Sequence, residues 1–127
     1  MIVVTLDTGA LIAMERQKPR AMMLLRAARE YRARLCAITP VITEWWRGRT
    51  DAREKICAAI EVVPFPAIAA RAAGGAVASM RHEGPSIVDV MVMAYAATLG
   101  GGLVYTSDMP DLDLLRREFP SVRVLAV

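Results

Sequence analysis

The fold of this chain is decided by residues 2–14, IVVTLDTGALIAM, where a strand pattern gives way to a helix pattern at a single aspartate. Residues 2–6 form a short β-branched apolar run, which predicts a buried strand. Residues 8–14 predict a short helix directly after it. Asp7 lies between the two elements. The stretch is therefore typical of the first half of a βαβ unit, with an acid at the carboxyl end of its strand.

The remainder of the chain repeats this alternation of strands and helices. We predict further strands at residues 35–39, 61–63, 103–106 and 122–127. Pro19 opens a helix in which the following residues keep helical spacing: Ala21, Leu24, Leu25, Ala28, Tyr31 and Leu35. The other predicted helices are 40–48, capped by Thr39, then 51–60, 67–81, 87–99 and 111–118. Such alternation predicts an α/β fold with a mostly parallel sheet.

Composition narrows the class of protein. With 127 residues, 55% of them hydrophobic and 23% charged, the chain fits one domain and is too apolar for disorder. Two cysteines without a C-x-x-C pair, together with one histidine, His82, exclude a disulfide scaffold and a His-rich metal cluster. The longest uncharged run, residues 90–107, is interrupted by three glycines, so we expect no membrane span. No signal peptide pattern is present, and we expect a cytoplasmic protein.

The net charge of +3 is carried mainly by arginine. Of the 16 basic residues, 14 are Arg and two are Lys. Arginine offers planar, bidentate hydrogen bonding to phosphate, which favours a polyanionic partner. A genome that prefers arginine codons explains the same composition, and the sequence leaves both explanations open.

Two acids are expected at the carboxyl ends of strands, where open α/β sheets bind their ligands. Asp7 follows the first predicted strand directly, and Asp108 follows the strand at 103–106 by two residues. Each also has an ordinary structural interpretation. Asp7 can cap the helix after it, and Asp108 can form an Asx turn that opens the last helix.

Two further acids stand in apolar surroundings. Asp89 is the only charge in residues 87–97, and a helix this apolar must be buried. A buried carboxylate must be protonated, paired or bound to metal, although Ser86 and Asp89 also have the spacing of a capping box. Glu44 has apolar residues on both sides and either faces a pocket at the sheet end or forms an exposed pair with Arg47.

Four carboxylates in one place would repel one another, and the pKa of each would rise. A divalent cation removes this repulsion. Mg²⁺ is held by a few carboxylates together with waters and substrate phosphates. Two such ions, about 3.5–4 Å apart, stabilise both the attacking and the leaving oxygen of phosphodiester hydrolysis. A site of this kind needs neither histidine nor cysteine.

Four segments in order resemble the motifs of PIN-domain nucleases. They are residues 6–13 (LDTGALIA), 38–44 (ITPVITE), 89–96 (DVMVMAYA), and 105–108 (YTSD) followed by Asp111 and Leu112. The resemblance covers essentially the whole chain. The compact size is similar to that of VapC-type toxins of toxin–antitoxin pairs.

This resemblance implies a single PIN-like nuclease domain over residues 1–127, with a three-layer α/β/α sandwich and a mostly parallel sheet. It implies a Mg²⁺- or Mn²⁺-dependent endoribonuclease that cleaves RNA, forms a homodimer and is neutralised by a cognate antitoxin. The catalytic and metal-binding positions fall on Asp7, Glu44, Asp89 and Asp108. The Thr106 hydroxyl would lie near the metal, and either Asp111 or Asp113 would supply an outer acid.

Other functions fit less well. An aspartyl-phosphate phosphatase with Asp7 as nucleophile requires a second Asp where this chain has Gly9. A phospho-receiver domain requires a lysine after a late strand, and both lysines precede residue 56. The main alternative is a non-catalytic PIN-like module that binds RNA or a protein partner. The presence of all four acids argues against a decayed site.

Overall fold

The computed structural model describes residues 2–80 and 84–127, and its strands form one all-parallel sheet. The strands are β1 (Val3–Leu6), β2 (Arg34–Ile38), β3 (Glu61–Val63), β4 (Leu103–Thr106) and β5 (Arg123–Ala126). Their order across the sheet is β3-β2-β1-β4-β5. The parallel α/β arrangement predicted from the sequence is therefore confirmed. Arg81, the last residue of one predicted helix, and His82 lie outside the described residues.

The sheet order places a topological switch point between β1 and β4. From β1 the chain continues outward to β2 and β3, then returns to the other side of β1 to form β4 and β5. Leu6 is paired with Tyr105, and the backbone N–H of Asp7 donates to the Tyr105 carbonyl at 3.2 Å. The carboxyl ends of β1 and β4 are therefore level, and ligands of open α/β sheets bind at this kind of position.

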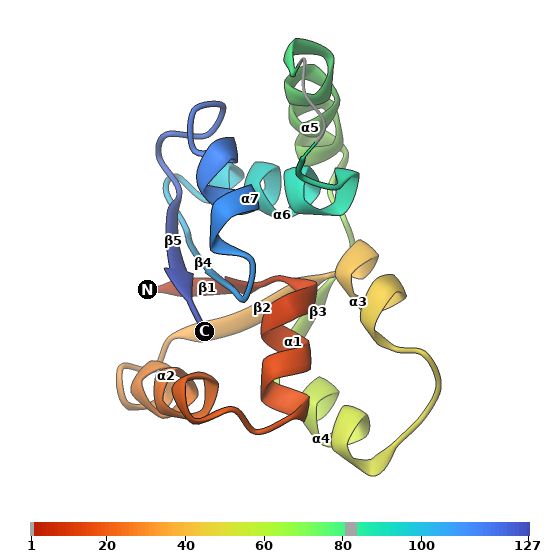
Figure 1. Cartoon of the computed structure of the whole chain (residues 1–127), viewed down its shortest axis with the longest axis vertical. Helices are drawn as coiled ribbons and strands as arrows, with labels where there is room; N and C mark the ends of the chain where they lie inside the picture. The colour runs from red at the N-terminus through yellow and green to blue at the C-terminus, as the bar shows by residue number, and fades with distance from the viewer. Residues whose placement is uncertain (1, 81–83) are drawn as a thin grey trace.

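Helices cover both faces of the sheet. They are α1 (Thr8–Glu15), α2 (Pro19–Glu30), α3 (Thr39–Trp45), α4 (Asp51–Ala59), α5 (Ala67–Ser79), α6 (Ile87–Thr98) and α7 (Met109–Leu115). Figure 1 shows α1, α2 and α4 on one side of the sheet and α6 and α7 on the other, with α5 extending beyond α6. This is the predicted three-layer sandwich. In the described part of the chain, no helix is long and apolar enough to cross a bilayer.

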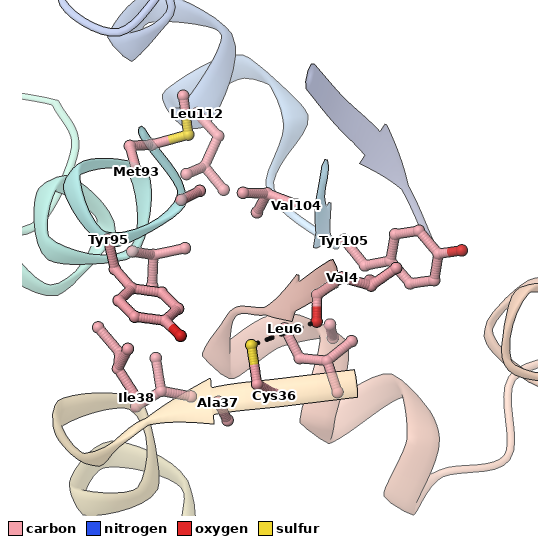
Figure 2. Packing of buried hydrophobic residues seen from close by; sticks show 14 of the residues in the cluster. Val4, Leu6, Cys36, Ala37, Ile38, Met93, Tyr95, Val104, Tyr105 and Leu112 are labelled. Atoms are coloured by element: carbon pink, nitrogen blue, oxygen red, sulfur yellow. Dashed lines mark hydrogen bonds between the residues drawn. The ribbon is translucent and has the colours of Figure 1, made fainter. Parts of the chain in front are cut away.

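The core lies between the sheet and these layers. Figure 2 shows Met93 of α6 and Leu112 of α7 packed near Val104 on one side of the sheet. All three side chains are fully buried. Helix α5 packs against the core through small side chains, because Ala69, Ala73 and Ala76 are buried. The sheet itself carries apolar side chains into both layers, as doubly covered parallel strands do.

The predicted helix from Pro19 ends earlier than its apolar spacing indicates. Helix α2 stops at Glu30, Tyr31 is 76% exposed, and Arg32 has a positive φ of 52° that ends the helical path. Leu35 keeps the helical spacing but is buried in β2. Tertiary packing thus overrides the spacing at both residues.

The ends of the other helices differ from the prediction as well. Thr39 is not a cap but the first residue of α3, and its hydroxyl accepts a hydrogen bond from the Phe65 N–H at 3.2 Å. Helix α3 ends at Trp45 rather than near Gly48, because Arg47 and Gly48 have φ values of 44° and 100°. Helix α7 begins at Met109, two residues earlier than predicted, and ends at Leu115.

Candidate metal centre

Asp7 connects β1 to α1 and is the most deeply buried acid of the candidate site. Its side chain is the N-cap of α1, where Oδ1 accepts a hydrogen bond from the Ala10 N–H at 2.7 Å, so the capping interpretation is correct. The residue is only 3% exposed. Burial raises the pKa of Asp7 to about 6, and the charges of Asp89 and Asp108 add to this rise. Hydrogen bonds from Thr106 and Ala10 act in the opposite direction.

Asp108 follows β4 and leaves its carboxylate free of capping. Asp108 occupies the N-cap position of α7, but its side chain makes no capping hydrogen bond. It therefore does not form the Asx turn considered from the sequence. The Thr106 hydroxyl, which is fully buried, instead accepts the Asp108 N–H at 2.8 Å. The Thr106 hydroxyl thereby interacts both with the Asp7 carboxyl, whose pKa it lowers, and with the backbone N–H of Asp108, as expected for a hydroxyl beside the site.

Asp89 lies in the first turn of α6 and combines two roles. The predicted capping box is present: the Ser86 hydroxyl accepts the Asp89 N–H at 3.2 Å, and Asp89 Oδ2 accepts the Ser86 N–H at 3.1 Å. Partial burial raises the pKa of Asp89, and the charges of Asp108 and Asp111 raise it further. Capping occupies one oxygen and does not remove the carboxylate from the acidic cluster.

Glu44 reaches the same end of the sheet from α3. Its Oε1 accepts a hydrogen bond from the Thr8 hydroxyl at 2.6 Å, and Thr8 directly follows Asp7. Among the described residues, Glu44 does not form the ion pair with Arg47 that its sequence spacing allows. Arg47 lies instead 3.9 Å from a carboxylate oxygen of Glu15. Glu44 is exposed, and its connection to Asp7 runs through the neighbouring residue Thr8.

Asp111 and Asp113, the two candidates for an outer acid, have different surroundings. Partial burial, the charge of Asp108 and a hydrogen bond with Asp108 raise the pKa of Asp111. Asp113 instead forms an exposed ion pair with Arg116 at 3.1 Å. Asp111 therefore belongs to the acidic cluster, and Asp113 does not.

Gly9 and Ser107 have no site role that the sequence alone predicts, yet they lie against each other. A Cβ on Gly9 would stand 1.9 Å from Ser107 Oγ and 3.1 Å from its Cβ. The first turn of α1 therefore touches the loop that carries Asp108, and a side chain at position 9 would force the two apart. The motif in residues 6–13 contained this glycine, but only the fold reveals what it contacts.

The chemistry of the cluster fits a hard divalent cation. Its groups are carboxylate and hydroxyl oxygens, which Mg²⁺ and Mn²⁺ accept readily together with water. Within residues 2–80 and 84–127, none of the ion pairs involves Asp7, Asp89 or Asp108, so no basic side chain of these residues balances their charges. In the same residues no three acidic, histidine or cysteine side chains are arranged to enclose an ion directly. A hydrated ion with few direct protein ligands suits this open arrangement.

Known structures share this architecture. A chain of VapBC2 from Rickettsia felis, solved bound to a DNA fragment from its promoter, has a TM-score of 0.76 at 10% identity, covering 99% of each chain. A chain of DNA-bound VapBC from Salmonella typhimurium has a TM-score of 0.74 at 18% identity, covering 99% of this chain and 98% of the other. These chains have the same fold as the present one. A chain of FitAcB from Neisseria gonorrhoeae also shares the fold, with a TM-score of 0.62, 13% identity and 96% coverage of both chains.

No protein-family model and no curated protein sequence matches the chain. The structural likeness therefore establishes the three-layer PIN-like fold, while the chemistry of the site is argued from its own residues.

Proposed function

We propose that this chain is a Mg²⁺- or Mn²⁺-dependent endoribonuclease with one nuclease domain over residues 1–127. The observation that carries the proposal is the buried carboxylate of Asp7, whose pKa is raised by burial and by the charges of Asp89 and Asp108. These three acids come from separate parts of the chain and gather at the switch point of the sheet. A divalent cation bound between these carboxylates would remove the repulsion among them.

Each acid has a distinct role in the proposed mechanism. Asp7, Asp89 and Asp108 would hold a hydrated cation, in part through its waters, and the cation would supply stabilisation of the negative charge that develops on the phosphoryl oxygens. Glu44 completes the site at its exposed side, where it orients the attacking water and accepts its proton. Thr106 relates the positions of Asp7 and Asp108, because its hydroxyl accepts the Asp108 N–H and lowers the pKa of the Asp7 carboxyl.

The RNA phosphates require positive charge near the exposed side of the site. Arg47 follows Glu44 by three residues and is 57% exposed, while Arg49 is 77% exposed and lies 3.5 Å from Glu54. Arg47 Nε donates to the Trp45 carbonyl at 3.3 Å and Nη2 lies 3.9 Å from Glu15, so binding of a phosphate by Arg47 would replace these two weak contacts. Arg20 of α2 is instead bonded to the Ala126 carbonyl, and Arg34 pairs with Glu61. Arg47 is therefore the first candidate for substrate binding.

The biological role that fits this chemistry is the toxin of a toxin–antitoxin pair. Chains of VapBC and FitAB share the fold over nearly the whole length of this chain. We expect a cytoplasmic homodimer that is neutralised by a cognate antitoxin, and a short open reading frame directly upstream would be the first clue to that partner. The alternative remains a module of the same fold that binds RNA or protein without cleavage.

RNA cleavage and RNA binding measured together test the proposal. Purified protein with end-labelled RNA should cleave when Mg²⁺ or Mn²⁺ is present and stop when EDTA is added. Asp7→Asn should lower the cleavage rate by about 100-fold or more, because one charge-stabilising group is lost. Asp113→Asn is the matched control, since Asp113 is an exposed acid outside the cluster.

Three outcomes separate the candidates. Undiminished cleavage in EDTA contradicts the metal mechanism. Equal losses in Asp7→Asn and Asp113→Asn contradict the assignment of the site. Tight RNA binding without cleavage under any metal condition favours the non-catalytic module.

A further inference from the structure

Glu15 is the last residue of α1 and stands at the opposite end of this helix from the acidic cluster. One of its oxygens, Oε1, accepts a hydrogen bond from Trp45 Nε1 at 3.0 Å. Trp45 is fully buried and is the largest such side chain among the described residues. Because an indole N–H that is buried without a partner costs free energy, Glu15 fixes where this ring can lie. Trp45 is the residue directly after Glu44 in α3.

The other oxygen of Glu15 binds a cation from α4. Arg53 Nη2 lies 3.2 Å from Glu15 Oε2, and the Arg53 side chain is only 13% exposed. Arg53 Nη1 donates to the Gly48 carbonyl at 2.9 Å and more weakly to that of Arg47 at 3.4 Å. Both of these residues have positive φ values, so the turn that ends α3 is held in its unusual shape by the arginine.

Removal of Glu15 would leave Arg53 poorly compensated. Arg53 Nε is already buried without a hydrogen-bond partner among the described atoms, so the guanidinium has no spare contact to lose. All residues of α4 are described and none of them is fully buried, which leaves few apolar contacts to hold this helix in place. The largely buried ion pair therefore couples α1, α4 and the turn after α3.

These contacts attach the last turn of α3 to α1 at two points. Glu44 Oε1 accepts from Thr8 at the start of α1, and Trp45 Nε1 donates to Glu15 at its end. We propose that Glu15 is a positioning residue for Glu44: through Trp45 and Arg53 it fixes the end of α3 and so the place of Glu44 relative to Asp7. This inference rests on the proposed function, in which Glu44 acts on the attacking water.

A double-mutant cycle tests whether Glu15 acts through Glu44. Glu15→Ala should lower kcat by about 10- to 100-fold with little change in KM, because a small displacement of a reacting group has effects of this size. The same change made in Glu44→Gln protein should cause no further loss of kcat. Glu30→Ala is the matched control, since Glu30 is the exposed last residue of α2. Equal losses in both backgrounds, or no loss in either, overturn the inference.

Glu15→Gln keeps the acceptor for Trp45 but removes the charge that binds Arg53. It should retain more activity than Glu15→Ala, and it replaces Glu15→Ala in the cycle if the alanine variant does not fold. A loss in Glu15→Gln equal to that in a folded Glu15→Ala overturns the role of the Trp45 hydrogen bond.

A second measurement does not depend on cleavage. In ¹H–¹⁵N spectra, Glu15→Ala should shift the Trp45 indole signal and the amide signals of Thr8 and Glu44, whereas Glu30→Ala should leave them unchanged. Unmoved Thr8 and Glu44 signals overturn the positioning role. An inactive wild-type protein with these shifts present would instead contradict the proposed function and leave the positioning of Glu44 supported.

Discussion

Asp7 is well placed to bind a metal ion, but without a metal its buried position disfavours the charged carboxylate. The pKa of Asp7 is raised from 3.8 to about 6, first by burial, so the folded protein binds this proton more tightly than the unfolded chain. The effect of Asp7 on the free energy of unfolding is therefore absent below about pH 4. As the pH rises from about 4 to 6, Asp7 lowers the free energy of unfolding. Above pH 6 the full penalty, about 3 kcal/mol, is present.

Asp7→Asn should consequently stabilise the metal-free protein at pH 7 while it lowers the cleavage rate by about 100-fold or more. Asparagine also caps helices, so the bond to the Ala10 N–H is retained. Urea unfolding in EDTA should give a stability gain of about 1–3 kcal/mol at pH 7 that vanishes near pH 4. Mg²⁺ should narrow the gap, because it stabilises only a folded protein that binds it. Parallel pH curves for the two proteins would contradict the raised pKa.

The aspartates of the site were predictable from single residues, but their connections were not. Asp89 attracts attention because it is the only charge in an apolar helix, and its capping box follows from local spacing. The bond between Thr8 and Glu44 joins residues 36 positions apart, and local patterns carry no information about it. Nor does local sequence distinguish Asp111 from Asp113, because only the fold shows which of them faces Asp108.

The order and type of the helices and strands could be predicted from the sequence more securely than the residues at which they begin and end. Each strand is a short, nearly continuous apolar run bounded by helix or turn patterns, so all five were expected near their observed places. Ends depend on distant partners instead. The hydroxyl of Thr39 was expected to cap its own helix, yet it bonds to Phe65, whose position is set by β3 and the turn after it. Leu35 likewise follows the spacing of a helix that the chain has already left.

The contact between α1 and the loop after β4 gives a prediction at this scale. Gly9→Ala should destabilise the protein by about 1–3 kcal/mol, since the new methyl group would overlap Ser107. It should also reduce cleavage, because the same loop carries Asp108. Ser107→Gly removes the overlapping side-chain atoms and should restore much of the loss. Urea unfolding midpoints and cleavage rates of the single and double variants measure both effects.

Gly75→Ala is the matched control for this change. A Cβ on Gly75 would meet nothing within 4 Å, and the residue lies inside the continuous helix α5. Alanine should therefore stabilise the protein by about 1 kcal/mol through its higher helix propensity. If Gly9→Ala behaved in the same way, α1 would not need to approach Ser107 closely.

For the whole molecule, α5 presents an unusual surface. Among its 13 residues, Arg71 carries the only charge, and one face is buried through three alanines. Much of the remainder is exposed, including Ile68 at 62% and Val77 at 42%. Figure 1 shows this helix extending away from the sheet. A helix exposed to this degree is ordinarily polar on its outer face, so α5 is the surface we expect to meet a second copy.

A symmetric dimer would bring the same α5 surface from both copies together, which makes each substitution act twice. Ile68→Glu should therefore shift the protein from dimer to monomer, since two charges would be forced into one apolar contact. Met23→Glu is the matched control, because Met23 is 51% exposed on α2 in the other helical layer. Sedimentation velocity over a concentration series measures both variants. A monomeric wild-type protein, or a dimer that Ile68→Glu leaves intact, would show that α5 is not the dimer surface.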